Sequence, residues 1–161
     1  MRISLLLALL ITQSLAHADT LTGRVVRVTD GDTIVILDSS DAQHKIRLTG
    51  IDAPERKQAF GTKSKDHLSD EVAGKFVVVD YSKRDYYKRI LGKELLNGED
   101  MNLEQVRAGL AWHYKKYQKE QSPEDRQLYS AMEIEAREAG RGLWHDPAPV
   151  PPWEYRKRKR N

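Results

Sequence analysis

The sequence predicts a small β-barrel that carries three helices, an α+β fold in a single domain. Two observations lead to this fold class: five short segments have strand composition, and the gaps between them contain three segments with helix signals. After the first 18 residues, the chain is long enough for one hydrophobic core and too short for two comfortable ones. We therefore expect one compact domain.

The five strand segments are short, β-branched and bounded by turn residues. Asp30-Gly31 and Asp38-Ser39-Ser40-Asp41 separate the first three segments, and Asn97-Gly98 closes the last. The predicted strands are Leu21–Val28, Thr33–Leu37, His44–Leu48, Phe76–Tyr81 and Ile90–Leu96. Five strands of this length are typical of a small barrel.

Three helices are predicted in the remaining gaps. The first covers residues 61–73, and the second begins at Asn102 as its N-cap. The third begins at Ser122, with Pro123 at its first position, and runs to Gly140. Its apolar stripe consists of Leu128, Ala131, Met132 and Ala139, which we expect to pack on the barrel.

The first 18 residues have the pattern of a secretory signal peptide. Arg2 precedes an apolar run over residues 3–11, and Ala16-His17-Ala18 is a small-x-small cleavage site. The run is too short to cross a bilayer. We expect export to a periplasm or the medium as a monomer with no membrane span. The sequence contains no cysteine, so no disulfide can stabilise the exported domain.

Beyond a domain over residues 19–145, residues 146–161 form a proline-rich and then basic tail. The basic run, residues 156–160, has two interpretations: a disordered solvated terminus, or an arm that binds phosphates nonspecifically. Residues 19–151 carry 21 Lys and Arg against 23 Asp and Glu. Net charge therefore does not attract nucleic acid to the body of the chain, so binding there requires locally placed bases and an ion.

One group of residues has the chemistry of a phosphoryl-transfer site. Asp32 and Asp52 lie at the start of one strand and just beyond the end of another, where they could bind a hard cation through oxygen. Arg47 and Arg89 could clamp a phosphate and stabilise a pentacoordinate transition state. Glu55 could activate water as a general base.

Each of these residues also has a purely structural interpretation. Asp30-Gly31-Asp32 could form only a hairpin turn, and Asp52-Ala-Pro-Glu a turn followed by a loop. Arg47 could be an exposed partner on an edge strand, and Arg89 part of a solvated charged face. An EF-hand is excluded, since Ile34 falls at position five of a loop that starts at Asp30 and no glycine falls at position six.

The motifs in combination resemble the staphylococcal nuclease family. They are Asp-Gly-Asp-Thr at residue 30, Ile-Arg-Leu followed by Gly-Ile-Asp-Ala-Pro-Glu from residue 46, Asn-Leu-Glu-Gln-Val-Arg-Ala-Gly-Leu-Ala-Trp from residue 102, and Gly-Leu-Trp from residue 142. The resemblance runs from about residue 21 to residue 144. It implies an OB-type five-stranded barrel with three helices, which agrees with the elements predicted above.

The resemblance also implies roles for individual residues. Asp32 and Asp52 match the calcium carboxylates, and Ala53 matches the position that lends a backbone carbonyl to the ion. Glu55 matches the general base. The phosphate-binding arginines match Arg47 and Arg89, and the aromatic position that contacts the nucleotide matches Tyr87. The implied activity is calcium-dependent hydrolysis of DNA and RNA to 3′-phosphate products.

One position departs from the family pattern, which commonly has Tyr-Gly-Arg where this chain has Tyr87-Lys88-Arg89. If position 88 needs a positive φ, loss of the glycine costs on the order of 1 kcal/mol. A slipped register would instead bring Arg84 or Lys88 towards the phosphate, and lysine lacks the bidentate fork of arginine.

Aromatic and basic residues follow the second helix. Tyr114 and Tyr117 suit stacking on bases, with packing at the barrel rim as the alternative, while Trp112 is predicted to lie in the core. His113 is predicted at the surface. Two further functions are open: a noncatalytic OB-fold binder of single strands, against which the intact Glu55 and aspartate pair argue, and an enzyme restricted to a special substrate.

Overall fold

A computed structural model of the protein describes residues 19–159. Its strands, in chain order, are β1 (Asp19–Asp30), β2 (Thr33–Leu37), β3 (Gln43–Leu48), β4 (Ile51–Asp52), β5 (Phe76–Arg84), β6 (Ile90–Leu96), β7 (Glu99–Asp100) and β8 (Trp112–His113). The α-helices are α1 (Gly61–Val72), α2 (Met101–Arg107), α3 (Pro123–Glu138) and α4 (Pro152–Arg158), with 3-10 turns η1 (Lys115–Glu120) and η2 (Gly142–His145). The predicted signal peptide lies outside the described residues.

Five strands close into a barrel, as the sequence predicts. Their order is β3-β2-β1-β5-β6, and a parallel pairing of β3 with β6 closes the ring through Ile46 opposite Ile90 and Arg47 opposite Leu91. Alternate side chains of each strand point inward, so Ile34, Ile36 and Ile46 are fully buried. The α+β fold with an OB-type barrel is confirmed.

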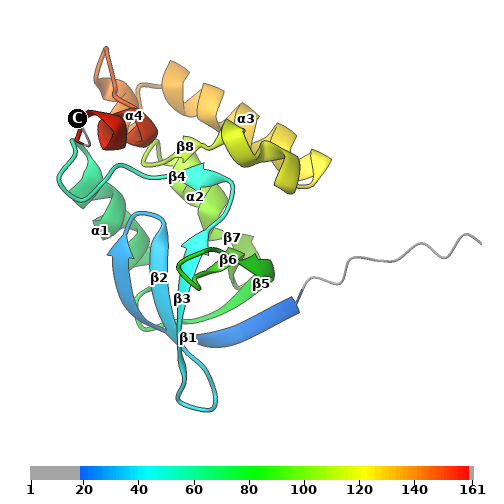
Figure 1. The fold of residues 1–161 in the computed structure, drawn as a ribbon. Helices are drawn as coiled ribbons and strands as arrows, with labels where there is room; N and C mark the ends of the chain where they lie inside the picture. Colours follow the sequence, from blue (N-terminus) through cyan, green and yellow to red (C-terminus); the bar gives the residue numbers. More distant parts are fainter. Residues whose placement is uncertain (1–18, 160–161) are drawn as a thin grey trace, which may run out of the picture.

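The helices gather at one end of the barrel, opposite the turn between β2 and β3 (Figure 1). The two-residue strands β4 and β8 pair antiparallel at this end, with Asp52 opposite Trp112. The turn between β1 and β2 also reaches this end, beside α1 (Figure 1). The fold therefore brings Asp32, Asp52 and the helices together.

Two details of the helices differ from the predictions. Asp100, not Asn102, caps α2 by accepting from the Leu103 N–H at 3.0 Å, whereas Asn102 is buried and joins β6 to Thr49 through its amide. The predicted stripe on α3 is only partly correct: Met132 packs against the core, but Leu128 is 44% exposed, and the buried residues of the helix are Tyr129, Glu133 and Ala136. Ser122 caps α3 as predicted.

The C-terminal segment contradicts the interpretation of a disordered basic tail. After the extended proline-rich stretch, residues 152–158 form helix α4 (Figure 1), whose Tyr155 hydroxyl donates to the Lys57 carbonyl in the loop before α1. Pro152 is buried at the first turn of this helix, where a missing N–H costs nothing. Among residues 19–159, no helix combines the length and the apolar character that crossing a bilayer requires.

Glu94 on β6 is a fully buried carboxyl whose two oxygens have no hydrogen-bond partner within the described chain. Burial, and then the charge of Asp100, raises the pKa of Glu94 to about 8. The folded state thus favours the protonated form. Its contribution to stability is fully present below the ordinary glutamate pKa near 4.5 and is lost as the pH rises to about 8.

We expect Glu94→Gln to remove this pH dependence. The unfolding free energy of the variant, relative to that of the wild type, should grow by roughly 1.4 kcal/mol per pH unit between those pKa values. Chemical denaturation at a series of pH values measures this difference. A constant difference across the range would show that Glu94 is not protonated in the folded protein.

Candidate active site

Two buried carboxylates and one arginine form the centre of the site. Asp32 is 6% exposed and Asp52 is completely buried. Arg47 bridges them: its Nη2 lies 2.9 Å from Asp52 Oδ1, and its Nη1 forms an ion pair with Asp32 Oδ2. The structure therefore brings together the two aspartates that the sequence predicted would meet, and Arg47 is not an exposed edge residue.

The turn that carries Asp32 is fixed by close packing and by a buried amide. An added Cβ at Gly31 would lie 2.9 Å from the Ala53 Cβ and would also collide with Ser64 of α1, so only glycine fits between the two segments. Gln105 of α2 donates from its Nε2 to the Gly31 carbonyl at 2.7 Å and to the Ser64 carbonyl at 3.0 Å. No sequence pattern assigns this role to Gln105.

Asp32 also binds the loop that carries Asp52. Its Oδ2 accepts from the Ala53 N–H at 2.7 Å, and its Oδ1 accepts from the Thr33 hydroxyl at 3.1 Å. On the other side, β8 pairs with β4 at Asp52. The two aspartates are therefore held by hydrogen bonds that belong to the fold, before any ion binds.

Burial and charge shape the electrostatics of the site. Burial raises the pKa of Asp52, and the bonds from two arginines offset only part of that shift. Burial and then the charge of Asp32 raise the pKa of Asp30 to about 7. Burial lowers the pKa of Arg47, but the charges of Asp32 and Asp52 outweigh it and keep the guanidinium charged. The buried carboxyls therefore favour the protonated form unless a positive group balances their charge.

Glu55 lies at the rim of the site, three residues after Asp52. Its side chain is 41% exposed, and its backbone N–H donates to Gln58 Oε1 at 3.1 Å. A carboxylate that reaches solvent beside two buried carboxylates is placed to accept a proton from water. Its role as general base stays a prediction.

A second arginine enters the site from the C-terminal helix. Arg156 of α4 donates from Nη2 to Asp52 Oδ2 at 2.7 Å and from Nη1 to Glu55 Oε1 at 2.8 Å. The hydrogen bond to Asp52, more than any other interaction, raises the pKa of Arg156. In the sequence, Arg156 is part of a basic run, and no pattern there indicates its contact with Asp52.

Arg89 lies elsewhere. Its backbone adjoins the β3–β6 pairing, but its side chain is paired with Asp85, with 2.8 Å from Nε to Oδ2. Tyr87 is 76% exposed, and the Arg89 guanidinium lies 5.7 Å from its ring centre. The structure thus holds Arg89 and Tyr87 in one loop, apart from the bonds that join Arg47, Asp32 and Asp52. Their substrate roles stay predictions.

Lys88 has the backbone conformation that a glycine favours. Its φ is 61°, and its N–H donates to the Asp85 carbonyl at 2.9 Å. The loop therefore keeps a left-handed residue at the position where the family commonly has glycine, and it does so with a lysine whose Cβ is strained.

We expect Lys88→Gly to raise the unfolding free energy by about 1 kcal/mol, because glycine relieves this strain. Thermal or denaturant unfolding measures the change. Lys88→Ala is the matched control, since it removes the same side-chain charge but retains a Cβ. Equal stability of the two variants would contradict the argument.

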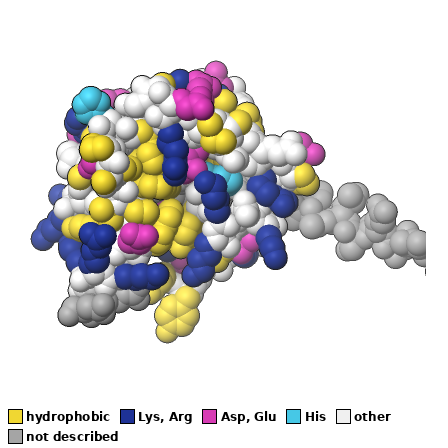
Figure 2. Space-filling model, turned by 90° about the horizontal axis from the view of Figure 1, so that it is seen from above, with side chains coloured by type: hydrophobic (Ala, Val, Ile, Leu, Met, Phe, Trp, Pro, Cys, Tyr) yellow, Lys and Arg dark blue, Asp and Glu magenta, His cyan; other side chains and the backbone are white. Residues whose placement is uncertain are grey.

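Aromatic side chains line the surface next to the site. Tyr114 stacks on Trp153 of α4 with ring centres 5.5 Å apart, and meets Tyr117 edge-on at 5.1 Å. Trp112 is 8% exposed, as predicted for a core position. Looking onto this end of the molecule, Figure 2 shows Lys and Arg side chains scattered around a hydrophobic stretch of surface. Substrate contact by Tyr114 and Tyr117 stays a prediction.

His113 is not the surface residue that the sequence predicted. It is 1% exposed, its Nε2 lies 2.8 Å from Gln121 Oε1, and burial lowers its pKa. Its backbone N–H donates to the buried Glu133 of α3 at 3.1 Å. This pairing explains why α3 buries a carboxylate where an apolar stripe was expected.

The donor chemistry of the site fits a hard cation such as calcium. Asp32 and Asp52 offer only oxygen, and their buried charges are balanced in the structure by guanidinium groups. No cluster of three or more His, Cys, Asp and Glu side chains within residues 19–159 is arranged to hold a metal ion. Two carboxylates alone would leave coordination positions for water and substrate phosphate.

Comparison with known proteins identifies the family. The family model described as staphylococcal nuclease homologue matches residues 45–146, which include Arg47, Asp52, Glu55 and Arg89. The chain belongs to the staphylococcal nuclease family. A protein of Escherichia coli named "Uncharacterized endonuclease" is 49% identical over 138 residues, covering 85% of this chain and 86% of its own length.

Two further relatives show how widely this similarity extends. A "Micrococcal nuclease" of Shigella flexneri is 38% identical over 148 residues, covering 86% of this chain and 82% of its own. An "Uncharacterized endonuclease" of Haemophilus influenzae is 39% identical over 139 residues, covering 86% of this chain and 75% of its own. This chain, a member of the same family, is accordingly a hydrolase of the nuclease class.

Proposed function

We propose that this chain is a calcium-dependent nuclease that hydrolyses phosphodiester bonds of DNA and RNA and leaves 3′-phosphate products. One observation carries the proposal: in a member of the nuclease family, Asp32 and Asp52 are buried side by side, with Arg47 between them and Glu55 at the rim. Nucleic acids are the substrates that the family implies.

In this proposal, each residue of the site has a defined role. Asp32 and Asp52, with the Ala53 carbonyl, would hold the ion, which would supply positive charge to polarise a phosphoryl oxygen. Glu55 accepts a proton from the water that attacks phosphorus in line. The new P–O bond forms as the P–O5′ bond breaks, and the leaving 5′-oxygen takes a proton from solvent.

The arginines stabilise the charge that develops on the phosphoryl oxygens. Arg47 is already held at the two aspartates, so exchange of one carboxylate partner for a phosphate oxygen needs little movement. Arg89 joins it only after release from Asp85. Tyr87, Tyr114 and Tyr117 offer ring faces to the bases beside the cleaved bond.

We also propose that the protein acts outside the cytoplasm, in a periplasm or the medium. The support is the signal-peptide pattern of residues 1–18. Mass spectrometry of the N-terminus of the protein recovered from the medium or the periplasm tests this. A protein that retains residues 1–18 inside the cell would contradict it.

Cleavage of single-stranded DNA and of RNA by the purified chain, in calcium, in magnesium and in excess chelator, tests the activity. We expect calcium to support cleavage of both and chelator to abolish it. The products should carry a 5′-hydroxyl, so that a polynucleotide kinase labels them without prior phosphatase treatment. Binding without cleavage in every buffer would instead indicate a noncatalytic OB-fold binder.

A further inference from the structure

The C-terminal helix places an arginine on the residues to which the proposed function assigns the cation and the base. Arg156 Nη1 lies 3.1 Å from Asp52 Oδ1 and 2.8 Å from Glu55 Oε1, and its Nη2 lies 2.7 Å from Asp52 Oδ2. Asp52 is completely buried, and Arg156 and Arg47 together bind both of its oxygens. Arg156 lies beyond the family match, which ends at residue 146.

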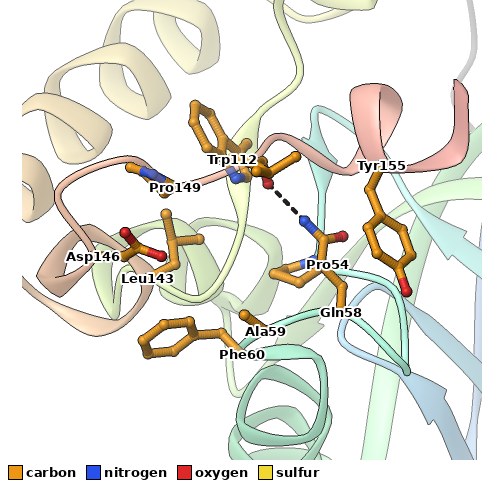
Figure 3. A pocket seen from close by; sticks show the side chains of 10 residues that line it. Pro54, Gln58, Ala59, Phe60, Trp112, Leu143, Asp146, Pro149 and Tyr155 are labelled. Carbon is orange, nitrogen blue, oxygen red and sulfur yellow. Dashed lines mark hydrogen bonds between the residues drawn. The ribbon is translucent and has the colours of Figure 1, made fainter. Parts of the chain in front are cut away.

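Contacts other than those of Arg156 hold α4 in this place. The position of Arg156 at the site is therefore set by the packing of the helix. The Tyr155 hydroxyl donates to the Lys57 carbonyl at 3.1 Å, and Gln58 Nε2 donates to the Val150 carbonyl at 2.6 Å. Figure 3 shows Tyr155 and this Gln58 bond beside a cavity of about 210 Å³ between the C-terminal segment and the loop after Asp52. On the opposite side, Trp153 stacks on Tyr114.

A divalent cation and the Arg156 guanidinium need the same oxygens. Calcium binds carboxylate oxygens at roughly 2.3–2.6 Å, well inside the space that a hydrogen-bonded guanidinium fills. The two groups are also both positive, so each repels the other across this short distance. Arg156 binds both oxygens of Asp52 and is the more exposed of the two arginines on this carboxylate, so it is the group that a cation at Asp52 would displace.

We infer that Arg156 is an internal counter-ion that competes with calcium for Asp52 and pairs with the base Glu55, so that helix α4 sets the calcium concentration at which the site fills. The inference rests on the proposed function. While Arg156 is bound, it also holds Oε1 of Glu55, one of the two oxygens that could take a proton from water. Arg156 thus links cation binding to the availability of the base.

Calorimetric titration of the full mature chain with calcium, without nucleic acid, tests the inference. We expect Arg156→Gln and Arg156→Ala each to bind calcium roughly tenfold or more tightly than the wild type, the size of an ordinary coupling between two ligands. Lys157→Gln is the matched control, because it removes one charge from the same helix at a residue that lines the groove of Trp112 and Tyr114. Its affinity should change less than twofold.

The same titration separates failure of this inference from failure of the proposed function. Asp52→Asn should lose calcium binding if the proposed site is correct. Unchanged calcium binding in Asp52→Asn would overturn the site itself, and the inference with it. Loss of binding in Asp52→Asn, together with Arg156 variants that match the wild type or the Lys157→Gln control, would overturn only the competition by Arg156.

Discussion

Arg47→Ala is expected to lower kcat/KM by about 10³-fold, because it removes the charge that would face the phosphoryl oxygens. It should also lower the unfolding free energy by about 3 kcal/mol, since it leaves two buried carboxylates with less compensation. Both effects follow from one observation, the bridge from Arg47 to Asp32 and Asp52.

Single-turnover cleavage and denaturant unfolding measure the two effects separately. Arg47→Lys is the informative control: it retains the charge but cannot form both bonds at once, so we expect it to recover much of the stability and little of the activity. Near-normal cleavage by Arg47→Ala would show that this arginine only supports the fold.

Glu55→Gln is expected to lower kcat by roughly 10²–10⁴-fold, the range that loss of a general base produces. Unlike the change at Arg47, it should leave the unfolding free energy nearly unchanged, because the Glu55 side chain is 41% exposed and its bond to Arg156 lies at the rim.

Glu154→Gln on α4 is the matched control for Glu55→Gln. Glu154 is similarly exposed and also pairs with an arginine, Arg158, but it makes no bond to the carboxylate cluster. Its cleavage rate should equal that of the wild type. If both variants cleaved at the wild-type rate, another group would have to activate the water.

The barrel was predictable because each of its strands appears in the sequence as a short apolar or β-branched run. Thr33–Leu37 and Ile90–Leu96 have the predicted bounds, since β-branched or apolar runs end there at turn residues. Helix α3 was predicted at its start, but its buried face only in part. Its buried face contains Glu133 and Tyr129, whose partners are His113 and Asp100, and a pattern of apolar residues cannot reveal such pairs.

The site was predictable in part for the same reason. Strand ends determine that Asp32 and Asp52 meet, and the β2–β3 register places Arg47 opposite Thr33. The pairing of Arg89 with Asp85 was not predicted, because a run of charged residues does not show which of its members pair. The role of α4 depends on contacts to Tyr114 and to residues 57–58, about 40 to 100 positions earlier, which no local pattern contains.

The calcium dependence of DNA cleavage by the wild type and by Asp52→Asn tests the central claim most directly. The account predicts that wild-type cleavage saturates with calcium, and that Asp52→Asn either fails to cleave or needs at least about 100-fold more calcium, because the site has lost one of its two charged ligands. The same calcium dependence in both proteins would contradict a catalytic ion at Asp32 and Asp52.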